Sequence, residues 1–392
     1  MPKLDFITQD LHELKNSGLY NIIRTLEGEN SSWVSIDGKK VLNLSCNNYL
    51  GLANHPEMKK AAQAAVDKYG VGAGAVRSIA GTMDIHINLE KALAKFKGRQ
   101  ACLVFQGGFM ANLAVIPAII RKSDIIFSDE LNHASVIDGS RLTKAQIIRY
   151  KHNDMADLEN KIKENKQFER KFIISDGVFS MDGDIADLKT IADLADKYNC
   201  VTIVDDAHGE GVLGKGGRGV VNHFNLGERI DIEVGTLSKA FGCAGGFVAA
   251  NKEVIDWLRQ RGRPFLFSNA LSPAEAGGCL KAIELLEHSE ELVNKLWENS
   301  KFFKAQLKEA GFDIGISQTP ITPVMLGEAS TAHAMSKRLY DEGIFAMALG
   351  YPTVPKGRAR IRAMLSAGHT KEDLQFAVNK FVSIGRELKV TK

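Results

Sequence analysis

The chain has 392 residues, of which 44% are hydrophobic and 25% charged, and its formal net charge is +3. These values are ordinary for a globular protein, and so small a net charge gives no argument for a nucleic-acid partner. The length exceeds the range over which a single core usually grows, so we expect one large domain and one smaller domain. Five scattered cysteines without a CxxC pair argue against a disulfide framework and a structural zinc site.

No targeting or membrane segment is expected. The first 16 residues mix charged and apolar side chains and lack the apolar core of a signal peptide. The longest apolar stretch, Ala111–Ile120, is about half as long as a bilayer requires, and it contains Pro117. We therefore expect a soluble cytoplasmic protein without membrane contact.

The N-terminal quarter is predicted to contain an arm, a hairpin and two helices. Residues 1–30 carry leucines near helical spacing, which predicts a helical arm for packing or dimerisation. Alternation over 33–44 around an Asp-Gly pair predicts a β-hairpin. Pro56 opens a helix that ends before a Gly- and Ala-rich stretch over 70–81, predicted as a loop, and a second helix follows over 84–97.

From residue 101 onward, apolar strand-like runs alternate with helical stretches such as 155–164 and 188–198. Mostly apolar strands separated by helices indicate a mainly parallel sheet covered on both faces, and hence an α/β domain. The predicted strands are Ala101–Phe105, Asp124–Phe127, Gln146–Tyr150, Lys171–Ser175, Val201–Asp205 and Ile230–Val234.

The pattern changes after Asn251. Three successive helices are predicted over 253–261, 273–287 and 291–310, and a β-α-β-β-α order follows up to residue 388. We therefore divide the chain into three parts, which are an N-terminal arm and hairpin (1–45), a large α/β domain (46–287) and a small C-terminal α+β domain (288–392).

Polar residues that follow the predicted strands are candidates for chemistry, because ligands bind at the carboxyl ends of parallel strands. Gly107-Gly108-Phe109 opens a helix and would present backbone N–H groups to an anion, although a plain strand-to-helix turn explains it equally well. His133 would stack on a flat ligand or belong to a helix N-terminus. The segment 176–183, which includes Ser180, is explained by a tight turn alone.

Asp205-Asp206 is the most informative pair, because two carboxylates after the apolar run 201–204 are costly to bury without a cationic partner. A metal, an arginine or a protonated ring nitrogen would serve. The absence of HExxH or of a second His/Cys group nearby disfavours a metal, which leaves the ring nitrogen as the sharpest candidate. Lys239 follows between Thr236 and Ser238, either as a surface cation or as a buried amine that condenses with an aldehyde.

One motif points elsewhere. Gly209–Lys215 matches the first part of a phosphate-binding P-loop, which would indicate an NTPase. Gly216 stands where Ser or Thr should bind magnesium, and no predicted strand runs directly into the motif. The sequence therefore disfavours the NTPase interpretation.

An anion-binding loop, a stacking His133, the carboxylate of Asp205 and the amine of Lys239 together suit a ligand with a phosphate, a pyridinium ring and an aldehyde. Pyridoxal 5'-phosphate has all three groups and is bound by a lysine and an acidic partner of its ring nitrogen. The sequence therefore predicts an enzyme that uses this cofactor. A cofactor-free binding protein that keeps the fold is the alternative from a different class.

Four motifs resemble those of the α-oxoamine synthase family and occur in the family's order. They are Asn47–Leu52, Asn132–Ser135, Asp205–Gly209 and Gly235–Lys239, and the resemblance extends from about residue 20 to 385. Members of that family are fold-type I pyridoxal-phosphate enzymes that join an amino acid to an acyl-CoA. The resemblance implies this fold and a homodimer with shared active sites.

The resemblance also implies roles for single residues. Lys239 would be the lysine that holds the cofactor and later takes the α-proton, Asp205 the partner of the pyridinium nitrogen, and His133 the stacking ring. Arg362, assisted by Asn47, would clamp the amino-acid carboxylate through its planar fork. The other implied contacts are His208 with the phenolic oxygen of the cofactor or with the acyl carbonyl, Gly108, Phe109, Ser180 and Thr236 with the cofactor, and Ser268 and Asn269 with the phosphate in the partner subunit.

Within the family, segments 132–139, 265–269 and 351–357 are most similar to the glycine C-acetyltransferase type, also called 2-amino-3-ketobutyrate CoA ligase. This similarity implies glycine and acetyl-CoA as substrates, as in threonine degradation. The alternative is the 8-amino-7-oxononanoate synthase type, which joins alanine to pimeloyl-CoA in biotin biosynthesis, or a promiscuous synthase. Gly107-Gly108 departs from the acetyltransferase pattern and leaves the acyl chain open.

Overall fold

The computed structural model describes residues 3–16, 20 and 23–391. Its centre is a seven-stranded sheet in the order β4-β10-β9-β8-β7-β5-β6. The strands are β4 (Ala101–Phe105), β5 (Ile125–Asp129), β6 (Gln146–Tyr150), β7 (Lys171–Asp176), β8 (Cys200–Asp205), β9 (Ile232–Thr236) and β10 (Gly246–Ala250). Strands β5 to β9 pair in parallel and β10 is antiparallel to both of its neighbours, so the predicted mainly parallel α/β sheet is confirmed.

Side chains that alternate along each strand enter two separate cores, as a sheet covered on both faces requires. On β4, Cys102 and Val104 pack in one core, whereas Leu103 and Phe105 pack in the other. The helices of this part are α2 (Pro56–Tyr69), α3 (Asp84–Lys97), α4 (Gly108–Ile119), α5 (Ala134–Thr143), α6 (Met155–Glu164), α7 (Leu188–Tyr198), α8 (Val220–His223), α9 (Lys252–Arg261), α10 (Arg263–Leu266) and α11 (Pro273–His288).

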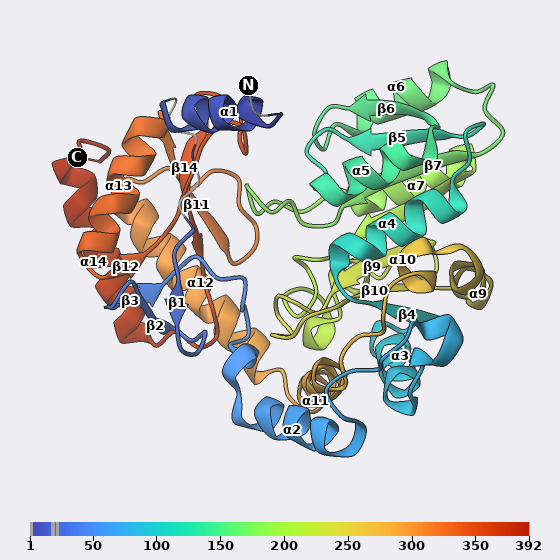
Figure 1. Ribbon diagram of the computed structural model, residues 1–392. Helices are drawn as coiled ribbons and strands as arrows, with labels where there is room; N and C mark the ends of the chain where they lie inside the picture. The colour runs from blue at the N-terminus through green and yellow to red at the C-terminus, as the bar shows by residue number, and fades with distance from the viewer. Residues whose placement is uncertain (1–2, 17–19, 21–22, 392) are drawn as a thin grey trace.

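The C-terminal part has a β-α-β-β-β-α order, because the single strand predicted over 344–349 is divided into two short strands that belong to different sheets. It contains α12 (Glu291–Glu309), β11 (Ile321–Gly327), α13 (Ala329–Asp341), β12 (Ile344–Phe345), β13 (Ala348–Leu349), β14 (Ala359–Met364) and α14 (Lys371–Glu387). One sheet has the order β11-β14-β13. In Figure 1 this part lies on one side of the molecule and the seven-stranded sheet on the other.

The N-terminal hairpin belongs structurally with the C-terminal part. Strands β1 (Leu26–Glu27), β2 (Trp33–Ile36) and β3 (Lys39–Asn43) form a sheet with β12, which pairs in parallel with β3. Both turn residues, Asp37 (φ 52°) and Gly38 (φ 73°), adopt the left-handed conformation that two-residue hairpins favour. The three domain boundaries that we predicted remain a proposal.

The arm is shorter than predicted. Helix α1 spans Asp5–Asn16, and the described residues 23–30 contain the short strand β1 instead of a helix. Part of the predicted arm, residues 1–2, 17–19 and 21–22, lies outside the described residues. Along the parts of the chain that the structure covers, we find no helix of the length and apolarity needed to span a bilayer.

Two further predictions need correction. Segment 77–81, predicted as loop, forms a π-helical turn, and Arg77 anchors it through Glu90 at 2.9 Å and Thr82 at 3.0 Å. Strand β10 was not predicted, because Gly-Phe-Val-Ala-Ala has no alternating pattern. It is buried along its whole length, where no polar side is needed.

Candidate active site

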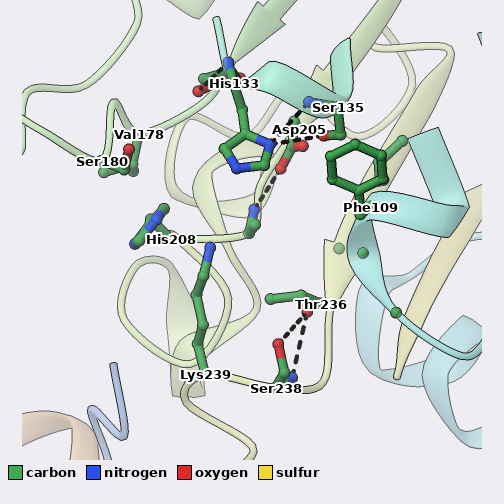
Figure 2. Close-up of a pocket in the computed structure, with 16 residues that line it drawn as sticks. Phe109, His133, Ser135, Val178, Ser180, Asp205, His208, Thr236, Ser238 and Lys239 are labelled. Carbon is green, nitrogen blue, oxygen red and sulfur yellow. Dashed lines mark hydrogen bonds between the residues drawn. The ribbon is translucent and has the colours of Figure 1, made fainter. Parts of the chain in front are cut away.

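A cavity of about 310 Å³ opens near the carboxyl ends of β7, β8 and β9 (Figure 2). Strand ends and the loops after them supply its walls, as expected for an α/β sheet. The lining residues are Gly107, Gly108, Phe109, His133, Ser135, Asp176, Val178, Ser180, Asp205, Ala207, His208, Val234, Gly235, Thr236, Ser238 and Lys239. Eight residues singled out from the sequence thus meet in one place, although they span 132 positions of the chain.

Asp205 ends β8 and is held rigidly beside the cavity. Its Oδ2 accepts a hydrogen bond from the Asn112 amide at 2.6 Å, and its Oδ1 accepts one from the backbone N–H of Ala207 at 3.0 Å. The side chain is only 7% exposed. Such a fixed and nearly dry carboxylate is suited to bind a protonated ring nitrogen.

The side chain of Asp206 does not line the cavity and contacts Lys97 instead, so the two consecutive carboxylates have different partners. Its Oδ2 lies 3.3 Å from the buried Nζ of Lys97, which also contacts Glu210 at 2.8 Å and Glu233 at 2.9 Å. The cationic partner expected for Asp205-Asp206 is therefore met at Asp206, by a lysine 109 positions away in the sequence. Asp205 remains available to the cavity.

Lys239 follows β9 and extends its amine toward His208 and His133 (Figure 2). Burial lowers the pKa of Lys239 to about 8; a negative charge on Asp205 or Asp176 opposes that shift, and Arg362 adds to it. An amine with this pKa is partly unprotonated near neutral pH, so it is able to attack an aldehyde and later to accept a proton.

The two histidines are neutral for the same reason. Burial lowers the pKa of His133, and burial together with the charge of Lys239 lowers the pKa of His208 well below its usual range. His133 precedes α5, and its Nδ1 lies 2.7 Å from Ser135 Oγ. The ring of Phe109 meets the His133 ring edge-on at 6.3 Å between centroids. These contacts fix the plane of the His133 ring against the cavity.

The residues present fit pyridoxal phosphate. At the start of α4, an added Cβ on Gly108 would lie 3.1 Å from the Thr236 Cβ, so a side chain at position 108 would crowd Thr236 at this wall of the cavity. The hydroxyls of Thr236 and Ser238 lie 2.8 Å apart at the same wall. Backbone N–H groups at a helix N-terminus and two hydroxyls suit a phosphate, as Asp205 suits the ring nitrogen and Lys239 the aldehyde.

Arg362 and Asn47 are also brought together. Arg362 donates from Nη1 to the carbonyl of Ser180 at 2.9 Å and from Nη2 to Oδ1 of Asn47 at 3.2 Å. Arg362 lines a second cavity of about 370 Å³, together with Tyr20, Ser45, His333, Met347, Ala348, Leu349, Gly350, Tyr351, Pro352 and Thr353. Arg362 therefore contacts Ser180, which lines the first cavity.

Ser268 and Asn269 do not line the first cavity of their own chain. They lie between α10 and α11, where Asn269 forms an isolated β-bridge with Val76. Their predicted contact with a phosphate in a partner subunit remains a prediction.

Sequence reasoning missed three residues of the site. Asp176 lines the cavity, Asn112 orients Asp205 from α4, and Tyr49 donates toward His208. Asp176 directly follows the predicted strand Lys171–Ser175, which was a usable signal. Asn112 and Tyr49 act through contacts across 93 and 159 positions, and no local pattern reveals such contacts.

The P-loop interpretation finds no support in the structure. Lys215 is exposed and begins a three-residue 3-10 turn, whereas the following glycines are buried against neighbouring backbone. A P-loop needs its lysine to face a phosphate cradle at the start of a long helix.

Comparison with known proteins agrees with this geometry. Residues 39–381 match the family model of class I and II aminotransferases. The 8-amino-7-oxononanoate synthase of Thermosipho melanesiensis is 59% identical over 97% of this chain and 98% of its own. That of Fervidobacterium nodosum is 55% identical over 98% of both chains.

Solved structures with the same fold belong to serine palmitoyltransferases and to an 8-amino-7-oxononanoate synthase. The serine palmitoyltransferase of Sphingomonas wittichii superposes with a TM-score of 0.94 at 31% identity, over 100% of this chain and 99% of that one. An SPT structure that carries PLP has the same TM-score at 32% identity, over 99% and 98% of the two chains. The 8-amino-7-oxononanoate synthase of Francisella tularensis superposes with a TM-score of 0.76 at 30% identity, over 88% and 98%.

Proposed function

This chain belongs to the α-oxoamine synthases, pyridoxal-phosphate acyltransferases of the class I and II aminotransferase family, and on that premise we propose that it is an 8-amino-7-oxononanoate synthase acting on alanine and pimeloyl-CoA. The observation that carries this choice is the 53–59% identity, over nearly full length, to relatives with that name. It favours the alternative we derived from the sequence over glycine and acetyl-CoA, which the loop motifs alone suggested.

The reaction joins the acyl group of the thioester to the α-carbon of the amino acid and releases CoA. Alanine supplies three carbons and the pimeloyl group seven, whereas the product has nine, so one carbon leaves as carbon dioxide. When bound, pyridoxal phosphate draws electrons from the α-carbon and thereby acidifies its proton. The protein must hold the amino acid, remove this proton and exclude competing reactions.

The residues divide these tasks. The guanidinium of Arg362 holds the amino-acid carboxylate, with Asn47 fixing its orientation. The Nζ of Lys239, whose pKa is lowered to about 8 by burial, takes the α-proton. Asp205 keeps the ring nitrogen charged, and His133 packs on the ring. Neutral His208 offers an N–H to the oxygen of the incoming acyl group.

The second cavity suits the acyl chain. Its lining combines polar residues with Met347, Leu349 and Tyr351, and Arg362 stands in its wall. Each methylene that an acyl chain buries against these three side chains contributes roughly 0.8 kcal/mol. A pimeloyl chain has more methylenes to bury there than an acetyl group does.

The active form is a homodimer. Val71, Ile79 and Phe267 are 81%, 83% and 71% exposed, and segments 70–82 and 267–270 meet at the Val76–Asn269 bridge. Large apolar side chains exposed on two adjoining segments are typical of a subunit interface. The same surface would bring Ser268 and Asn269 to a neighbouring subunit.

A matrix of substrates tests the proposal. Free-CoA release is measured for alanine, glycine and serine against pimeloyl-CoA and acetyl-CoA. Alanine with pimeloyl-CoA should give the highest kcat/KM. A preference for glycine with acetyl-CoA would restore the first expectation, whereas equal rates for all pairs would indicate a promiscuous synthase.

A further inference from the structure

Two carboxylates stand side by side at the edge of the sheet. Strands β7 and β8 are parallel neighbours, and their register pairs Asp176 with Asp205. Residues paired in this way project from the same face of a sheet. Both side chains line the cavity, at 5% and 7% exposure. Two acids so close together in a dry site are not able to ionise independently.

The donors around them decide which one keeps the charge. Asp205 receives two separate hydrogen bonds, from the Asn112 amide at 2.6 Å and from the Ala207 N–H at 3.0 Å. Asp176 receives a single N–H, that of His133, shared between its two oxygens at 3.2 Å each. Hydrogen bonds to the anion favour ionisation, so the better-served Asp205 is the anion of the pair.

The wider surroundings act in the same direction. Burial and the charge of Asp205 raise the pKa of Asp176 well above its usual range, and Asp129 adds to this rise. The His133 N–H and the charge of Lys239 work against it without cancelling it. Asp205, Asp129, His133 and Lys239 are thus the neighbouring groups with the largest effect on the pKa of Asp176.

We propose that Asp176 is a positioning carboxylic acid, which keeps its proton in the resting site, holds the backbone of His133 and leaves Asp205 as the only anion facing the cofactor ring. One anion matches the single positive charge of the ring nitrogen. A second anion beside Lys239 would raise the pKa of its amine, so a smaller fraction would be unprotonated and able to take a proton near neutral pH. This inference rests on the pyridoxal-phosphate chemistry and is independent of which acyl-CoA is used.

The protonation state is measured directly on the apoenzyme. An infrared difference spectrum between wild type and Asp176→Asn at pH 7 should show the loss of a carboxylic-acid C=O band. The matched control, Asp205→Asn, should remove a carboxylate band instead. Loss of a carboxylate band in Asp176→Asn would overturn the proposal. If Asp176→Asn does not fold, carbon-13 NMR of wild-type apoenzyme labelled at the aspartate carboxyl groups makes the same distinction.

The positioning role of Asp176 is tested by comparing a conservative variant with one that has no hydrogen-bond acceptor. Asparagine mimics a protonated Asp176, since it is neutral and accepts from the His133 N–H, whereas leucine has a similar shape and accepts nothing. Asp176→Asn should keep the pH midpoint of the visible cofactor band within ~0.3 pH units, because it removes no charge, whereas removal of a nearby anion shifts a midpoint by about one unit. It should also keep kcat within about threefold, with Asp176→Leu at least about tenfold slower. Equal losses in the two variants, or a midpoint shift near one unit in Asp176→Asn, would contradict the proposal.

Discussion

The hydroxyl of Tyr49 lies 2.7 Å from Nδ1 of His208. Burial raises the pKa of Tyr49 far above the physiological range, so the phenol keeps its proton and donates it to the ring nitrogen. Since His208 is neutral, its own proton is then on Nε2. Tyr49 therefore fixes the tautomer of His208 in which Nε2 donates, as the proposed contact with the acyl oxygen requires.

Replacement of Tyr49 by phenylalanine tests this relationship. The loss of the donor frees the tautomer of His208, and we expect kcat to fall about tenfold, the equivalent of about 1.4 kcal/mol. Cofactor binding, followed by the visible absorbance band, should remain close to that of wild type. Loss of the cofactor band in Tyr49→Phe would show that the tyrosine acts on the cofactor site as a whole.

Lys239→Ala should abolish both the covalent attachment of the cofactor and turnover. Without the amine, no group at this position attacks the aldehyde or takes the α-proton, and CoA release should fall at least about 1,000-fold. Lys252→Ala, which removes an exposed lysine at the start of α9, is the matched control and should be yellow and active. Full CoA release by Lys239→Ala would refute the assignment.

Arg362 and Arg360 lie two positions apart on β14, and substitutions at the two positions distinguish substrate binding from fold stability. Arg362→Lys loses the planar fork, so KM for the amino acid should rise at least about tenfold with little change in the unfolding midpoint. Arg360 is 1% exposed and donates to Asp182 at 2.6 Å and to the Met181 carbonyl at 3.0 Å. Arg360→Lys should lower the unfolding midpoint and leave KM near wild type. An inverted pattern would exchange their roles.

His152 gives the fold a pH-dependent contribution to stability. Its Nδ1 lies 3.1 Å from Asp129 and its Nε2 lies 2.9 Å from Asp184, so both nitrogens must donate. Burial works against the charged ring, but the two aspartates raise the pKa of His152 to about 10. A raised pKa stabilises the fold fully below pH ~6.5, and this contribution is lost as the pH rises toward 10.

Urea unfolding of wild type and His152→Gln at pH 6, 8 and 10 measures this contribution. The stability difference between the two proteins should be greatest at pH 6, shrink steadily, and be smallest at pH 10. A difference that does not change with pH would mean that the contacts of His152 are structural and independent of its charge.

Much of the fold follows from local pattern. Strand β6 and helices α3, α6 and α7 have the predicted bounds, because their apolar spacing is regular and their ends carry capping residues. Strand β10 was not predicted because Gly-Phe-Val-Ala-Ala, buried inside the sheet between β4 and β9, has no alternation of polar and apolar residues. The predicted helical arm was longer than helix α1, because the spacing of leucines indicates a helix but does not show where it ends.

The site residues at the ends of strands could be predicted from the sequence. Contacts between residues far apart in the sequence could not. Asp205 and Lys239 were predicted as site residues because each is a charged residue that follows an apolar, strand-like run. The partner of Asp206 is Lys97, 109 positions away, and only the folded chain shows that contact. The predicted roles of Ser268 and Asn269 involve a second subunit. The proposed acyl-CoA rests on whole-chain similarity, whereas the loop motifs favoured glycine and acetyl-CoA.

The central claim is tested most directly with alanine labelled with carbon-13 in its carboxyl group and with pimeloyl-CoA as acyl donor. Labelled carbon dioxide and free CoA are measured in the same reaction. The proposed function predicts equal amounts of the two and a nine-carbon amino-oxo acid that retains no label. Release of CoA with the label kept in the product, or no reaction with this pair while glycine and acetyl-CoA react, would contradict it.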